Sequence, residues 1–295
     1  MIYLTKNDWE NIILPKLNNA PLFNKELQIS GYINARIDEF LKMRQLGPKS
    51  VQGQLGPKSV QGLIESTFLI FHKYKICSKT FSLINSPPVD IIITIGTCLF
   101  IAGEILNIIF FTDEIAEYFK PFLDKKNPSN KLDIDQIIQK IKDKQIEILT
   151  TIGFNINLDL PYSLLFKIEH YIEKKCYDYK NHIILLNDII LDSYFFPLPL
   201  YFIPDIIILS SANILISQYN CDYLNIEELI ALSEFQIDKK ELEQCTSLIL
   251  KISEEFQLKL AQKGQDKKEK VGNITSQLKE DKLIKAISSI KMNVE

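Results

Sequence analysis

The chain has 295 residues and a formal net charge of −3, so it lacks the basic excess with which proteins capture nucleic acid. Direct nucleic-acid binding is therefore not expected. Only 10 glycines and 12 prolines occur, which favours a helical protein with few strand turns. This length has room for two domains, each with its own core.

Reactive side chains are scattered rather than grouped. The five cysteines show no CxxC spacing and are expected to be reduced thiols, the three histidines show no metal-ligand spacing, and His72 is expected to be structural. Neither a phosphate-binding glycine loop nor a nucleophile elbow is present. We therefore expect no active site, no metal and no cofactor. The first eight residues lack the long apolar core of a secretory signal.

The chain begins with an N-terminal extension, 1–29, that carries Trp9. Residues 24–45 have the 3-4 spacing of an amphipathic helix. The side chains expected to face inward are Leu27, Ile33, Ile37, Phe40 and Leu41.

A nine-residue segment, Gln45–Gly53, is repeated letter for letter as Gln54–Gly62. A solenoid needs longer and more numerous repeats. The repeat indicates a recent duplication or an artefact of the gene model, and a recognition loop is the alternative. A helix is expected from Ser59 to about Lys75.

Two proline-marked apolar runs of helical length follow, Pro88–Leu106 and Phe202–Gln218. A helix that is apolar all round belongs at the centre of a domain. The stretch Ile91–Phe111 carries a single charge, Glu104, and imitates a membrane span. That charge and the absence of flanking basic anchors favour a buried helix, so no membrane association is expected.

Amphipathic segments surround these two runs. A short helix is expected over Asp113–Phe119, capped by Thr112 or Asp113, and a polar loop over Asp124–Asn130. A helix over 133–152 carries an isoleucine-rich stripe that includes Gln145, and Gly153 ends it. Further helices are expected over 161–176, Ile183–Asp192 and Ile226–Ser233. A last helix carries Leu242, Cys245, Ile249, Ile252 and Phe256.

Beyond this helix the chain is polar and charged from 263 to 275, which is typical of disorder. Leu283, Ile284, Ile287 and Ile290 have the spacing of a short docking helix, and a frayed tail is the alternative.

Five phrases carry a family resemblance in the correct order: Phe68–Tyr74, Leu99–Ile105, Glu147–Ile156, Leu160–Tyr162, and Asn187–Leu191 with Phe202–Pro204. They are similar to the cyclin patterns "hhhFHRFY", "LFLAxKVEE", "IILxxLGFxL", "hPY" and "NDSLRT…YxPxxIA". The start, Tyr3–Asn11, looks like the "WYFTxEQLEN" of the transcriptional T, K and L type cyclins. The resemblance covers about residues 2–262.

This resemblance implies an all-α fold of two tandem five-helix cyclin boxes. The first box would cover 30–157, with the duplication as an insertion, and the second 158–262, followed by a charged tail over 263–295. It also implies a nuclear protein.

The chain departs from the family where cyclins anchor their kinase. The family's lysine position is Glu104, the acidic pair after it is Leu106-Asn107, and the family's glutamate position is Gln145. With Phe154, these residues form the expected partner-binding site.

Two functions remain open. The chain is expected to bind and activate a transcription-type cyclin-dependent kinase by biasing the kinase's mobile helix. Alternatively, it is a cyclin-fold scaffold that contacts other protein subunits of a larger complex and binds no kinase. The loss of the charged kinase-anchoring residues favours this alternative.

Overall fold

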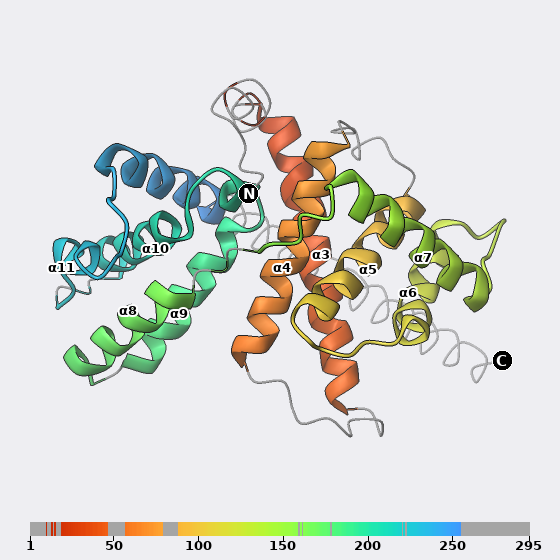
Figure 1. Ribbon diagram of the computed structural model, residues 1–295, viewed down its shortest axis with the longest axis horizontal. Coiled ribbons are helices and arrows are strands. Elements are labelled where there is room, and N and C mark those ends of the chain that lie inside the picture. The colour runs from red at the N-terminus through yellow and green to blue at the C-terminus, as the bar shows by residue number, and fades with distance from the viewer. Residues whose placement is uncertain are drawn as a thin grey trace, which may run out of the picture. The chain divides into compact units, whose positions relative to one another are not determined.

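The computed structural model describes the following residues: 10, 13, 15, 19–46, 57–78, 88–158, 160, 162–177, 179–219, 221 and 223–254. Every regular element within these ranges is a helix (Figure 1), which confirms the predicted all-α fold. The chain divides into two compact units, 1–252 and 253–295, and the following description concerns the first. The division into two cyclin boxes stays a prediction.

Several sequence predictions fall outside the described residues. They concern Trp9, most of the first copy of the duplicated segment, Phe256 and the tail over 263–295.

Helices α3 to α7 form what we call the first group. α3 (Ala20–Leu46) and α4 (Pro57–Cys77) are followed by α5 (Pro88–Ile105), which packs against α4, α6 (Thr112–Lys126) and α7 (Ile134–Thr151). All five side chains predicted to face inward from α3 are buried. Ile95 and Leu99 of α5 are fully buried, as predicted for a central helix. No described helix combines the length and apolarity needed to cross a membrane.

The second group comprises α8 (Tyr162–Lys175), α9 (Tyr179–Ser193), the 3-10 turn η3 (Leu198–Leu200), α10 (Pro204–Gln218), α11 (Ile226–Ile230) and a helix that begins at residue 239. α10 packs against α8, α9 and α11 and is buried along nearly its whole length, as predicted. It starts two residues later than expected, because Pro204 occupies its first turn, where proline's missing N–H leaves no bond unmade.

An aromatic turn joins the two groups. Tyr194–Phe196, which follow α9, lie against α3 and α4: Ser30 Oγ donates to the carbonyl of Phe195 at 2.7 Å, and the rings of Phe23 and Phe196 are 4.9 Å apart. His72 Nε2 donates to the carbonyl of Tyr194 at 3.0 Å. Since this histidine is buried, it has the structural role expected for it.

The structure corrects the predicted length of α6. The helix was predicted as Asp113–Phe119 and extends to Lys126, so the polar loop begins at Asn127 rather than Asp124. Pro121 lies inside the helix, although proline lacks the N–H that the helical hydrogen-bond pattern needs. Burial of Leu123 and the Lys120–Asp124 ion pair at 3.0 Å stabilise the turn beyond it.

Two helix ends also differ from prediction. The N-cap of α6 is Phe111 rather than Thr112 or Asp113, since the Glu114 carboxylate accepts from the N–H of Phe111 at 3.3 Å. α11 ends at Ile230, three residues before the predicted Ser233, whose hydroxyl donates to the Asp205 carboxylate of α10.

Candidate functional site: the ends of α5 and α7

The C-terminal end of α5 is fixed by a tight turn. Asn107 adopts a left-handed conformation (φ 56°), and the N–H of Ile108 returns to the carbonyl of Gly103 at 2.8 Å. Phe110 folds back onto the helix, so that a Cβ on Gly103 would lie 2.3 Å from its ring. A glycine is therefore required here, and the residue after it, Glu104, is left at the surface.

The C-terminal end of α7 closes in a similar way. Gly153 (φ 64°), predicted to end this helix, and Phe154 (φ 53°) are both left-handed. The N–H of Phe154 reaches the carbonyl of Leu149 at 2.7 Å, which satisfies one of the helix's last free carbonyls. The turn leaves Phe154 65% exposed.

Asn107 and Phe154 are the non-glycine residues with positive φ within the described ranges, and both belong to the predicted partner-binding set. Asparagine tolerates this conformation, whereas for a bulky residue such as phenylalanine it is uncommon and costs about 1 kcal/mol or more. Backbone strain of this kind clusters at functional sites. Among the residues of this face, Phe154 therefore has the backbone conformation that most favours a functional role.

The structure brings Glu104 and Gln145 together. They lie 41 positions apart in sequence, and the side-chain amide of Gln145 donates to Glu104 Oε2 at 2.9 Å. Partial burial raises the pKa of Glu104 above its usual value. The two positions at which the family carries a lysine and a glutamate thus hold a carboxylate and an amide that bind each other.

Leu106 and Phe154 occupy different surroundings from this pair. Leu106 is half-buried beside α4, where its Cδ1 is 4.0 Å from the position that a Cβ on Gly62 would take. Phe154 extends toward solvent after the end of α7, and Ile146 of α7 is equally exposed. The candidate face therefore combines one carboxylate–amide pair with exposed apolar side chains.

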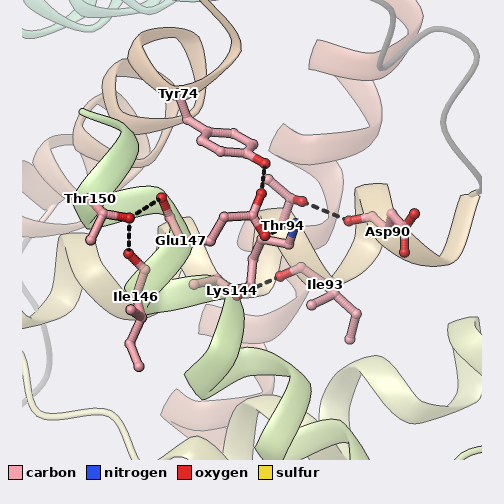
Figure 2. A network of polar contacts seen from close by, with 9 residues as sticks. Tyr74, Asp90, Ile93, Thr94, Lys144, Ile146, Glu147 and Thr150 are labelled. Carbon is pink, nitrogen blue, oxygen red and sulfur yellow. Dashed lines mark hydrogen bonds and ion pairs between the residues drawn. The ribbon is translucent and has the colours of Figure 1, made fainter. Parts of the chain in front are cut away.

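A polar network that the sequence did not predict holds α7 against α4 (Figure 2). Tyr74 donates to the Glu147 carboxylate, and Lys144 pairs with the same carboxylate at 2.7 Å. Burial acts to raise the pKa of Glu147, but hydrogen bonds from Lys144 and Tyr74 bring it below its usual value. The i, i+3 spacing of Lys144 and Glu147 was the one available signal.

Hydroxyl groups inside α5 are satisfied locally. Thr94 donates to the carbonyl of Asp90 at 2.7 Å, as Figure 2 shows, and Thr97 to that of Ile93 at 2.8 Å. Because these hydroxyls bond to carbonyls of their own helix, the buried part of α5 serves for packing. The polar side chain that α5 offers to a partner, Glu104, lies near its C-terminal end. Within the described ranges, no group of three His, Cys, Asp or Glu side chains could hold a metal ion.

Comparisons with known proteins leave the family open. No protein-family model matches the chain, and no curated protein matches it. The structure superposes on a chain of the yeast TFIIK (Kin28/Ccl1/Tfb3) complex with a TM-score of 0.49 and 15% identity, over 84% of this chain and 96% of that chain. A likeness with a TM-score below 0.5 is weak, and it carries no argument about function.

Proposed function

We propose that the protein is a cyclin-like regulatory subunit that binds and activates a transcription-type cyclin-dependent kinase in the nucleus. The observation that carries the proposal is the Glu104–Gln145 hydrogen bond, which joins the two positions expected to anchor a kinase. The ordered set of cyclin-like phrases and the all-helical structure are its further support.

Activation would act through a population shift. A kinase is active when a conserved lysine pairs with a glutamate on a mobile helix, and a partner that binds only the inward position of that helix favours the active state. Phe154 and Ile146 supply exposed apolar surface for such a helix. A backbone hydrogen bond closes each of the turns after α5 and α7, and a backbone that is already ordered lowers the entropy cost of binding.

The chemistry of the face defines the partner. A lysine at position 104 would cap helix carbonyls and pair with a carboxylate, whereas Glu104 is an acceptor. Its partner must therefore present an N–H donor or a basic side chain opposite Glu104. A kinase adapted to other cyclins would place a carboxylate there and be repelled.

Affinity purification followed by mass spectrometry is the first test. A tagged full-length chain is expected to recover a protein kinase in stoichiometric amount, and the purified pair to phosphorylate a peptide substrate faster than the kinase alone. Phe154→Ala should reduce recovery, while Phe235→Ala, a similarly exposed phenylalanine on the second group, serves as the matched control. Recovery of stoichiometric partners without any kinase would contradict the proposal.

The second candidate function is a cyclin-fold scaffold that binds other subunits. The feature in its favour is that the charged anchors are lost: Glu104 and Gln145 stand where the family carries its lysine and its glutamate. Phosphorylation assays separate the two candidates, because a scaffold would bind its partners at this face without changing any kinase's rate.

A further inference from the structure

A close contact between the two groups lies beside the candidate face, at Gly62 of α4. A Cβ on this glycine would lie 2.2 Å from the hydroxyl oxygen of Tyr162, the first residue of α8, and 3.4 Å from its Cζ. The same Cβ would lie 4.0 Å from Cδ1 of Leu106, which belongs to the predicted partner-binding set. The phenol of the second group and a residue of the candidate face therefore both pack over the bare backbone of Gly62.

Glu65, which is fully buried one turn further along α4, faces the Tyr162 hydroxyl. Its Oε2 is 3.5 Å from this hydroxyl, while its Oε1 accepts from Gln61 Nε2 at 2.7 Å. Burial and the nearby carboxyl raise the pKa of Tyr162, so the phenol keeps its proton and is the donor. A hydrogen bond of 3.5 Å is weak, and the position of the ring therefore depends mainly on its packing over Gly62.

The connector between α7 and α8 is tied to α4 at a second point. The buried Lys73 donates from its Nζ to the carbonyl of Asn157 at 2.7 Å. At the helical rise per residue, Lys73 and Gly62 lie about 16 Å apart along α4. The connector therefore runs beside α4 between two anchors, and the second anchor is the Tyr162 ring.

Leu106 begins the turn that leaves Glu104 at the surface. Its N–H bonds to the carbonyl of Ala102 at 3.1 Å, and Asn107, with its positive φ, follows it directly. Leu106 is half-buried, and part of its surroundings is the site over Gly62. If the Tyr162 ring leaves this site, space opens beside Leu106 and the turn loses packing that limits its movement.

We propose that Tyr162 is a positioning residue of the candidate face, whose ring, packed over Gly62, fixes the Leu106–Asn107 turn. The proposal rests on the proposed function for the identity of the partner, whereas the packing is a property of the free chain. Packed side chains of this kind carry coupling between distant parts of a protein. A change in the second group would therefore alter the affinity of the face for its partner through this contact.

Hydrogen exchange of the free, full-length protein tests the packing, read by mass spectrometry in peptides that cover 103–110. Tyr162→Ala should speed the exchange of this segment several-fold, because the backbone hydrogen bonds of the turn open more often. Tyr162→Phe keeps the ring and should exchange at the parent's rate. Tyr171→Ala is the matched control: it removes another tyrosine of α8, whose hydroxyl donates to Glu228 within the second group, and should leave 103–110 unchanged.

A pair of variants isolates the contact over Gly62. Gly62→Ala places a methyl group against the Tyr162 hydroxyl and should displace the ring, so exchange of 103–110 should rise as it does in Tyr162→Ala. Alanine forms helices better than glycine, so unfolding of α4 cannot explain such a rise. Adding Tyr162→Phe to Gly62→Ala removes the clashing oxygen and leaves the ring carbon at 3.4 Å, so exchange should return to the parent's rate. A double variant without this rescue, or a parent-like rate in Tyr162→Ala, would overturn the proposal.

Titration of the kinase recovered with the tagged chain separates this proposal from the proposed function. Tyr162→Ala should weaken kinase binding several-fold, whereas Tyr162→Phe should bind as the parent does. If no kinase is recovered while exchange follows the expected pattern, the proposed function fails and the positioning role stands. If the kinase binds Tyr162→Ala as tightly as the parent, the positioning role fails and the proposed function stands.

Discussion

The central helices α5 and α10 are alike along their length and differ at their ends. Each opens with a proline and buries almost every side chain of its middle turns. α5 leads into a left-handed turn at Asn107 that leaves Glu104 at the surface, whereas the C-cap of α10, Tyr219, has φ −111°. Burial of apolar side chains thus explains the middle of both helices, whereas the two helices differ in the backbone conformation and the surface side chains at their C-terminal ends.

Matched core truncations test the similarity of the two helices. Leu99 of α5 and Leu209 of α10 are both fully buried. Leu99→Ala and Leu209→Ala should each lower the free energy of unfolding by about 2–5 kcal/mol, because each leaves a cavity. Chemical denaturation measures both, and a loss below about 1 kcal/mol for either variant would show that its helix is not a true core element.

The junction between the two groups should respond to pH through Glu65 of α4. Its buried carboxyl accepts from Gln61 Nε2 at 2.7 Å and faces the hydroxyl of Tyr162, with Tyr194 nearby. Burial raises the pKa of Glu65 from 4.5 to about 7, against the hydrogen bonds from Gln61 and Tyr162. The folded protein therefore binds this proton more tightly than the unfolded chain does.

The sign of the effect follows from that difference. Ionisation of Glu65 costs no stability below about pH 4.5, a growing amount up to pH 7, and a constant amount above. Glu65→Gln should match the parent protein near pH 4 and exceed its free energy of unfolding near pH 8, by up to about 3 kcal/mol. Identical pH profiles for the two proteins would contradict this account.

The helix ends can be tested at Phe154. Phe154→Gly and Phe154→Ala both remove the exposed ring, but only glycine adopts a positive φ without strain. The glycine variant should be more stable than the alanine variant by about 1 kcal/mol. Thermal denaturation of the pair measures the backbone cost alone, and equal stabilities would mean that the left-handed turn is not strained.

The smallest effect on stability is expected from deleting one copy of the duplicated segment, which the first group has and the second lacks. Deleting Gln54–Gly62 leaves an identical nine-residue sequence before Leu63, so the start of α4 can re-form from the first copy. Shortening the connection changes its closure entropy by on the order of 1 kcal/mol. The melting temperature should fall by less than about 8 °C, and a larger fall would show that both copies are needed.

The 3-4 spacing of apolar residues allowed the helices and their buried faces to be predicted, because the side chains on the buried face of a helix recur at that spacing. The inward face of α3 and the end of α7 at Gly153 are confirmed. The second half of α6 was not predicted, since local propensity does not include the packing of Leu123. The domain boundaries stay a prediction.

The sequence predicted which residues form the candidate site, but not how they are arranged in space. Glu104 and Gln145 were selected because they depart from a family pattern, and their contact across 41 positions depends on how α5 and α7 pack. The positive φ of Phe154 could not be foreseen, because phenylalanine rarely adopts it. The Tyr74–Glu147 bond had no sequence signal, since tyrosine and glutamate are common on helix faces.

The most direct test of the account is the affinity of the purified kinase for Glu104→Lys, measured by titration calorimetry beside the parent protein. We expect binding to weaken by more than about 1 kcal/mol, or about fivefold, because an acceptor becomes a like charge opposite the partner's donor. Gln145→Lys, which removes the amide but keeps Glu104 as an acceptor, should weaken binding less. Unchanged or tighter binding by Glu104→Lys would show that the face does not anchor a kinase.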